Sequence, residues 1–228
     1  MNTLIISDLH LSSDEDKKTL LLIDFLNQQQ NTIQQLFILG DLFNVWLGDD
    51  ISIQLFPKLI HTFKNSSFPI YIIRGNRDFL LDKKFAKLSN TTLIKEPYVF
   101  EDFVLLHGDS FCTDDIKYQQ FKKIIQSPIT KKIFLSLPKI IRQKIAVFLR
   151  EKSTISNQKK PTFIMDINQQ SVNKFMSKYP NKTLIHGHTH KQKIHKNPSF
   201  KRIVLGDWNN TKGNALILND EIKFIEIS

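Results

Sequence analysis

Seven side chains that can bind a metal ion recur along this chain, and each group of them follows a short apolar run. The runs cover residues 4–6, 37–39, 70–73, 104–106 and 183–185. We interpret the runs as buried strands and the residues after them as loops at their carboxyl ends. The candidate ligands are Asp8, His10, Asp41, Asn76, His107, His188 and His190.

The spacing within this set favours a shared site. Asp8 and His10 are two residues apart, as are His188 and His190, so each pair can point toward one ion from an extended segment. The other three ligands each have a glycine neighbour, which lets the backbone turn closely around a centre. Taken singly, any of them could be a loop cap or a surface histidine. That alternative does not explain the whole set at successive strand ends.

The ligand types indicate the chemistry. Carboxylate, amide and imidazole groups together suit Mn²⁺, Fe²⁺ or Zn²⁺, whereas a structural zinc site would favour cysteines, and the chain has only Cys112. Seven ligands fit two ions that share one carboxylate, for which Asp41 is the candidate. Two ions roughly 3.5 to 4 Å apart can hold a hydroxide and clamp the oxygens of a phosphoryl group. We therefore expect hydrolysis of a phosphoester or phosphoanhydride.

The elements that position these residues follow an α/β rhythm. The first part alternates strands with helices, and the last third returns to strands after a hairpin at 98–107. This change from crossover helices to hairpins predicts two packed sheets with outer helices, in a single domain over residues 1–228. The expected strands are 4–7, 36–39, 70–74, 98–100, 103–107, 183–186, 202–205, 215–218 and 222–227, and the expected helices are 19–29, 53–64 and 83–88.

A basic helical insertion separates the two halves. Apolar residues recur at helical spacing from about 116 to 164, while Pro128 and Pro138 predict several short helices rather than a long one. Residues 116–160 hold 12 Lys or Arg against one acid, so this segment accounts for the net charge of +10. We expect a helical lid at about 116–160, with Phe121, Phe134 and Phe148 packed on its apolar face.

Length and composition narrow the class of protein. The 228 residues are 41% hydrophobic, enough for a buried core. No apolar stretch approaches the roughly 20 residues of a spanning helix, and the first residues lead directly into a strand without a basic leader. A single cysteine excludes an internal disulfide. These features predict a cytoplasmic protein.

The residues that carry the metal argument resemble the calcineurin-like metallophosphoesterase family. The resemblance spans residues 4–190, and it implies one metal bound by Asp8, His10, Asp41 and His190. The second metal would be bound by Asp41, Asn76, His107 and His188, and Mn²⁺ is the expected ion. The matching motifs are Asp8-Leu9-His10, Gly40-Asp41, Gly75-Asn76, His107-Gly108-Asp109 and Gly187-His188-Thr189-His190.

Arg77 departs from the broad family pattern, in which a histidine at this position is thought to protonate the leaving group. An arginine is no general acid near neutral pH, but its planar fork matches a phosphate. A phosphate leaving group, with a second pKa of about 6, can depart without a proton. Arg77 therefore indicates a pyrophosphate substrate. The alternative is a surface arginine paired with Asp78.

Further motifs are similar to a narrower family, the UDP-2,3-diacylglucosamine hydrolases of lipid A biosynthesis. They are residues 40–43, 46–50, 75–81, 112–115 and 164–166. The resemblance implies attack of a metal-bound hydroxide on the α-phosphorus, which gives UMP and 2,3-diacylglucosamine 1-phosphate, with Asp41, Asn76, Arg77 and His188 in catalytic roles. Asp207 stands where this family more often has a small residue, and the sequence assigns it no role. The implied substrate contacts are Asn76, Arg77, Asp115, Ser153, Asn157, Lys160 and His188.

The basic insertion permits three interpretations: a solvated helical face, a nucleic-acid surface or a membrane surface. Nucleic-acid binding is not expected, because the three phenylalanines follow the apolar periodicity. An apolar stripe bordered by lysines is typical of a peripheral membrane helix. We expect binding to the cytoplasmic face of an anionic inner membrane. The alternatives are another dinuclear metallophosphoesterase acting on nucleotides or nucleic acid, or a non-catalytic scaffold. Oligomeric state is not indicated.

Overall fold

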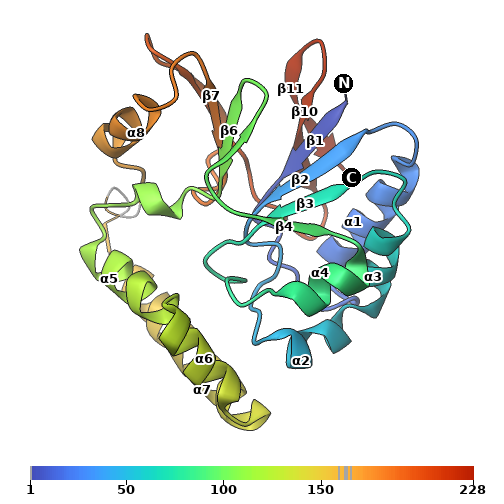
Figure 1. Ribbon diagram of the computed structural model, residues 1–228, viewed down its shortest axis with the longest axis vertical. Helices are drawn as coiled ribbons and strands as arrows, with labels where there is room; N and C mark the ends of the chain where they lie inside the picture. Colours follow the sequence, from blue (N-terminus) through green and yellow to red (C-terminus); the bar gives the residue numbers. More distant parts are fainter. Residues whose placement is uncertain (1, 159, 162–163, 165) are drawn as a thin grey trace.

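Two β-sheets form the centre of the molecule in a computed structural model, which describes residues 2–158, 160–161, 164 and 166–228 (Figure 1). The first sheet has the strand order β11-β10-β1-β2-β3-β4, and the second has the order β5-β6-β7-β9-β8. The predicted two-sheet α/β fold is confirmed. The strands are β1 (Thr3–Ile6), β2 (Gln35–Leu39), β3 (Ile70–Ile73), β4 (Thr92–Ile94), β5 (Tyr98–Phe100), β6 (Phe103–Leu106), β7 (Thr183–His186), β8 (Lys193–Lys196), β9 (Lys201–Val204), β10 (Gly213–Leu218) and β11 (Ile222–Ile227).

Parallel pairing brings the ligand loops to one edge of each sheet. Strands β1, β2, β3 and β4 pair in parallel, and so do β6, β7 and β9 in the second sheet. Antiparallel strands close the other positions: β10 and β11 in the first sheet, β5 and β8 in the second. The carboxyl ends of the parallel strands therefore lie together, which is where the predicted metal ligands are found.

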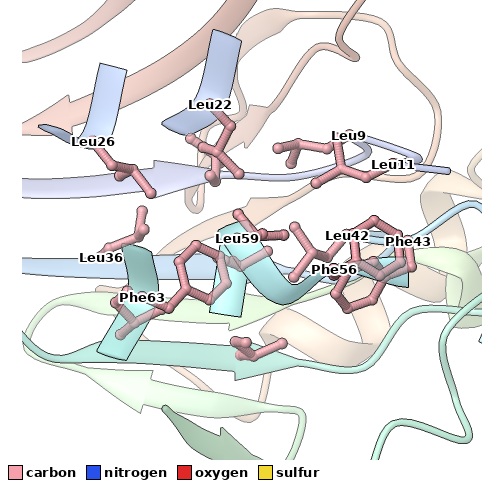
Figure 2. Packing of buried hydrophobic residues seen from close by; sticks show 14 of the residues in the cluster. Leu9, Leu11, Leu22, Leu26, Leu36, Leu42, Phe43, Phe56, Leu59 and Phe63 are labelled. Atoms are coloured by element: carbon pink, nitrogen blue, oxygen red, sulfur yellow. The ribbon is translucent and has the colours of Figure 1, made fainter. Parts of the chain in front are cut away.

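The central strands are apolar on both faces because both faces are covered. In β2, Leu36 and Ile38 face the helices, while Phe37 and Leu39 face the second sheet. Helices α1 (Lys17–Gln28), α3 (Pro57–Lys64) and α4 (Lys83–Ser89) cover the outer face of the first sheet (Figure 1). Figure 2 shows this packing around Leu22 of α1. The layer between the sheets holds the second part of the core.

Helix α8 (Gln169–Met176) covers the outer face of the second sheet (Figure 1). Its buried Val172 and Met176 pack with Val104 and Leu184 of that sheet. This helix and the short edge strands β4 and β8 are absent from the sequence prediction. The predicted helix 53–64 is divided into a 3₁₀ turn (Ile53–Leu55) and α3, because Pro57 begins a new helix. The short helix α2 (Asp49–Ser52) precedes this span and was not predicted.

Three inserted helices project from the body (Figure 1): α5 (Ile116–Ile125), α6 (Pro128–Ser136) and α7 (Lys139–Gln158). Pro128 starts α6 and Pro138 precedes α7, as the sequence predicts. We call α5, α6 and α7 the lid helices. Among the described residues, 11 of the 16 exposed large hydrophobic side chains lie on them. No described helix is long and apolar enough to span a bilayer.

The expected packing of the lid phenylalanines is wrong for two of the three. Phe134 packs against the main core, but Phe121 and Phe148 are 42% and 53% exposed. The lid helices project from the body, so part of their apolar face lacks a covering layer. The Nζ atom of Lys152 lies 4.6 Å from the centre of the Phe148 ring instead.

Arg142 ties the lid helices to the body. This residue of α7 is 3% exposed, and its guanidinium donates to the carboxylate of Asp50 and, at 2.7 Å, to the carbonyl of Leu47. On the preceding lid helix, α6, Lys131 Nζ donates to the carbonyl of Phe79 at 3.1 Å. The lid is therefore held against the loops that follow β2 and β3.

Candidate metal centre

All seven predicted ligands lie at the carboxyl ends of five strands, and backbone hydrogen bonds tie their loops together. The His10 amide donates to the carbonyl of Asp41 at 2.9 Å, which joins the β1 and β2 loops. The Gly187 amide donates to the carbonyl of His107 at 2.9 Å, which joins the β6 and β7 loops. Both sheets therefore contribute ligands to one centre.

The backbone at these positions is unusual. Nine described residues other than glycine have a positive φ, and five of them are predicted ligands. A left-handed backbone is sterically costly for most side chains, and such residues cluster at functional sites. The loops therefore turn sharply at the ligands themselves. These five are Asp8, His10, Asp41, His188 and His190.

Asp8, His10 and His190 form the first of two ligand groups, within 4.8 Å of one another. The two histidine Nε2 atoms are 3.4 Å apart, and His190 Nε2 lies 3.5 Å from Asp8 Oδ1. Asp8 Oδ1 and His10 Nδ1 are buried but make no hydrogen bond to any described residue. A buried polar atom without a partner is costly, and a metal ion supplies one. The first group therefore fits a cation.

Asp8, Asp41 and His107 form the second group. His107 Nδ1 donates to the Leu39 carbonyl at 2.9 Å, so Nε2 turns inward, 3.0 Å from Asn76 Oδ1. The ring of His188 lies 5.1 Å from that of His107. This geometry brings Asn76 and His188 beside the second group, where the resemblance implies them.

Asp41 faces both groups. Its Oδ2 lies 3.9 Å from His10 Nδ1, and its Oδ1 lies 3.8 Å from His107 Nε2. Asp41 is 2% exposed, so few water molecules can reach it. Asp8 also belongs to both groups, a sharing that the sequence did not anticipate. The arrangement suits two divalent cations with a carboxylate between them.

Two carboxylates hold the ligand loops. Asp8 Oδ2 accepts from Ser7 Oγ at 2.6 Å and from the His188 amide at 2.8 Å, which orients its other oxygen toward the first group. Asp78 is fully buried and accepts from the amides of Leu42 at 2.8 Å and Gly75 at 2.6 Å. Asp78 therefore joins the Asp41 loop to the Asn76 loop. The sequence indicated Asp78 only as an alternative partner of Arg77 and assigned it no other role.

The pKa values of the histidines differ because their surroundings differ. Burial lowers the pKa of His10 to about 3 and that of His188 to about 4, so both are neutral near pH 7. Burial alone would lower the pKa of His107, but the carboxylates of Asp41 and Asp8 raise it to about 9. Burial also raises the pKa of Asp41 above its ordinary value. Without metal, His107 therefore carries a proton.

We expect metal binding to strengthen as pH rises. A ligand must lose its proton to bind a metal, and His107 releases its proton only near pH 9. Below that pH the ion bound by His107 displaces one proton, so the Kd for this ion should fall roughly tenfold per pH unit. Equilibrium dialysis with Mn²⁺ at pH 6, 7 and 8 measures this. A Kd that is constant over this range would contradict the protonated state of His107.

Arg77 points toward the ligand groups rather than to Asp78. Its Nε lies 3.6 Å from Asp41 Oδ2, and its amide donates to Asp41 Oδ1 at 2.9 Å. Its guanidinium also donates to Asn44 Oδ1 at 3.2 Å, and Arg150 of the lid donates to the same oxygen at 2.8 Å. Two guanidinium groups therefore converge beside the centre, which suits an anionic substrate group.

Comparison with known proteins agrees with this geometry. A family model described as calcineurin-like phosphoesterase matches residues 1–192. A protein of Serratia proteamaculans named UDP-2,3-diacylglucosamine hydrolase is 39% identical over 99% of this chain and 99% of its own length. A protein of the same name in Shewanella piezotolerans is 42% identical over 100% of this chain and 98% of its own length. The chain belongs to the UDP-2,3-diacylglucosamine hydrolase family of calcineurin-like phosphoesterases.

The fold has a wider distribution than this hydrolase family. The solved structure of a putative 5'-nucleotidase from Staphylococcus aureus aligns over 99% of this chain and 54% of that chain. The TM-score is 0.51 and the sequence identity is 13%. At this identity the likeness concerns the fold alone. The substrate must therefore be argued from the site.

The lid contacts implied by the hydrolase family are only partly brought together. Asp115 Oδ1 accepts from the Tyr118 amide at 3.1 Å and caps α5, while its Oδ2 pairs with Lys160 Nζ at 2.6 Å. This pair joins the two ends of the lid. Ser153 is exposed on α7, and among the described residues no contact joins it to the ligand groups. The side chain of Asn157 lies outside the described part.

Asp109 and Tyr118 connect the lid to the metal centre, a link that sequence reasoning missed. Asp109 is buried and accepts from Tyr118 Oη and Lys122 Nζ, both at 2.7 Å. The ring of Tyr118 lies 6.4 Å from that of His188. The sequence feature that could have indicated this link is Asp109 itself, the acid directly after His107-Gly108, for which we predicted no role.

A cavity of about 240 Å³ lies between the lid helices and the end of β3, beside Gly75. Lys122 and Lys131 line it on the lid side, and Arg74 and Lys95 line it on the body side. Asp109 and Glu96 are the acids of its wall. The basic side chains give this space an excess of positive charge next to the ligand groups.

Proposed function

We propose that the chain hydrolyses the diphosphate of UDP-2,3-diacylglucosamine to UMP and 2,3-diacylglucosamine 1-phosphate, in lipid A biosynthesis. The observation that carries the proposal is that the ligand groups lie directly beside the lid helices, which bear both basic side chains and exposed apolar side chains. Tyr118 and Arg150 of the lid lie next to His188 and Arg77 of the centre, respectively. A phosphate-cleaving site with an apolar neighbour suits a lipid-linked diphosphate.

The ligands suit two divalent ions, because carboxylate, amide and imidazole groups occur together. We propose Mn²⁺, the ion that the family resemblance implies. When bound, the ions would activate water and stabilise charge on the phosphoryl oxygens. Asp8, His10, Asp41 and His190 would hold one ion. Asp41, Asn76, His107 and His188 would hold the other.

The protein's own groups bind and orient the diphosphate. The Arg77 guanidinium lies beside Asp41 and can hold the α-phosphate in two hydrogen bonds. Asn76 lies on the same turn, where its amide can contact that phosphate. The departing sugar phosphate needs no proton, so an arginine in place of a general acid suits this reaction. The exposed apolar side chains of the lid would contact the acyl chains.

The direct test is incubation of the purified protein and Mn²⁺ with UDP-2,3-diacylglucosamine in detergent. UMP should appear together with the acylated sugar phosphate in equal amounts. Nucleoside diphosphates and a DNA oligonucleotide serve as alternative substrates. Faster cleavage of either alternative, or no UMP at micromolar enzyme, would refute the assignment.

Arg77→Ala should lower kcat/KM for the UDP substrate roughly 10²-fold, because a preorganised donor to the phosphoryl group is lost. Arg77→Lys should recover little of this loss, since an ammonium does not reproduce the fork. Arg74→Ala is the matched control, because Arg74 donates to the Leu81 carbonyl rather than toward Asp41. Steady-state rates measure the effect. Equal losses in the Arg77 and Arg74 variants would contradict a specific role.

We also propose that the lid lies peripherally on the cytoplasmic face of the inner membrane. Its exposed side chains include Ile124 at 63%, Ile129 at 73% and Ile140 at 66%. Lysines lie among them, and each basic residue near an anionic surface contributes about 1 kcal/mol. The combination favours an anionic lipid surface over a purely solvated face.

Sedimentation with liposomes tests the membrane proposal. Binding to vesicles with anionic lipid should be strong at low salt and should weaken at high salt, because screening shortens the electrostatic range. Ile129→Ser with Ile133→Ser should reduce binding without changing metal content, since both side chains are exposed. Equal binding to neutral vesicles would contradict the electrostatic part of the proposal.

A further inference from the structure

Asp207 lies directly behind one of the predicted metal ligands. Its Oδ2 is 3.1 Å from His190 Nδ1, while His190 Nε2 points the other way, 3.5 Å from Asp8 Oδ1. We propose that Asp207 is a positioning residue for the metal centre. Its carboxylate lies where it can accept the Nδ1 proton of His190, and it thereby keeps Nε2 directed at the first ligand group.

The same arrangement occurs at a second histidine of the centre. His107 donates from Nδ1 to the Leu39 carbonyl, and its Nε2 faces Asn76 and Asp41. A histidine that binds a metal through one nitrogen usually donates the other N–H to a carbonyl or carboxylate, which sets its tautomer and its ring orientation. His107 uses the main chain for this purpose, whereas His190 uses the side chain of Asp207.

The segment that carries Asp207 is anchored to the centre. Asp207 follows β9, and its carbonyl accepts from the side-chain amide of Asn214. The next residue, Trp208, is buried, and its amide donates to the Asp8 carbonyl at 3.4 Å. The Asp207 backbone is therefore tied to a ligand loop on one side and to β10 on the other.

The contribution of Asp207 is geometric more than electrostatic. Its side chain is 52% exposed and that of His190 is 35% exposed, so water screens the attraction between charges. The 3.1 Å contact between Asp207 Oδ2 and His190 Nδ1 still favours the Nδ1–H tautomer and one ring orientation.

The inference rests on the proposed metal centre but not on the substrate. Loss of a partner of this kind lowers metal affinity about 10- to 100-fold. In Asp207→Ala, one of the two ions should bind more weakly by that factor and the other should be unaffected. Asp207→Asn keeps an oxygen acceptor without the charge and should restore most of the affinity. Asp220→Ala removes an exposed acid at the far end of β10 and serves as the charge control.

Equilibrium dialysis with Mn²⁺ and elemental analysis measures both affinities, and ¹⁵N NMR of the metal-free protein reports the tautomer of His190. We expect weaker binding of one ion and a mixed His190 tautomer in Asp207→Ala, with the melting temperature of the metal-free protein unchanged. Wild-type affinity in Asp207→Ala would overturn the proposal, as would equal losses in the Ala and Asn variants or in Asp220→Ala. If the wild type bound two ions and Asp207→Ala did too, equally tightly, the metal centre would stand and this inference would fail. A wild type that bound no Mn²⁺ would refute both.

Discussion

Asp41→Ala should lower turnover of the UDP substrate by at least roughly 10³-fold, with loss of one or both ions. Asp41 faces His10 and His107 from within the core, and no other described side chain has an oxygen toward each of them at under 4 Å. Two-metal stabilisation of a phosphoryl group amounts to several kcal/mol, and each 1.36 kcal/mol is a factor of ten in rate. Product formation and metal content, measured on the same preparation, test the prediction.

The metal-free Asp41→Ala variant should lose less stability than Asp78→Ala, because Asp41 accepts from one backbone amide, that of Arg77, whereas Asp78 accepts from at least two. Burial raises the pKa of Asp41, which means that the fold disfavours its charged form. Asp78→Ala is the matched control, because it removes a buried carboxylate that accepts from the amides of Leu42 and Gly75. Each amide left without a partner costs about 1–3 kcal/mol, so this control should unfold at lower urea. Retained activity in Asp41→Ala would refute the two-metal site.

Gly75→Ala should weaken metal binding as strongly as Asp41→Ala does. A methyl group at this position would lie 2.1 Å from Asp41 Oδ1 and 2.3 Å from the Asp41 amide nitrogen, so the Asp41 loop must move. A displacement of about 1 Å in a catalytic group can cost roughly 10²-fold in rate. The Mn²⁺ Kd and the rate at saturating Mn²⁺ measure the two consequences.

Gly213→Ala is the matched control for Gly75→Ala. Its methyl group would lie 2.5 Å from the ring of Trp208, and its three closest neighbours all belong to that ring. Overpacking of this kind costs about 1–3 kcal/mol, so both variants should lose stability to urea. Gly75→Ala should lose more metal affinity than Gly213→Ala, because its methyl group displaces the ligand Asp41 directly, whereas Trp208 reaches the centre only through its amide to the Asp8 carbonyl. If Gly75→Ala bound Mn²⁺ normally, the close approach of its backbone to Asp41 would not define the site.

Local patterns predicted the parts of the fold that depend on local chemistry. The apolar runs at β1, β2, β3, β6 and β7 are strands within one or two residues of their predicted bounds. These strands are buried on both faces, so nearly every residue in them is apolar and the signal is strong. The edge strands β4 and β8 are half-exposed and short, and β8 contains three polar residues among four. Such strands depend on pairing with a neighbour, which a local pattern does not encode.

The lid shows the same limit on local patterns. Helical periodicity and the two prolines predicted its helices, because both act within a few residues. The packing of Phe121 and Phe148 depended on a second layer of protein, which the fold does not provide there. Periodicity identifies an apolar face but does not identify what covers it.

The sequence by itself determined the ligand types, their order along the chain and the basic character of the insertion, since each is a property of residue type and spacing. The tertiary structure decided which oxygen and nitrogen atoms meet, and so it identified the roles of Asp78, Asp109 and Asp207. Each of these carboxylates acts on a residue at least nine positions away, through a hydrogen bond or ion pair to Leu42, Tyr118 or His190. These residues become partners only because the folding of the two sheets brings separate loops close together. The order of residues within any one loop does not specify that approach.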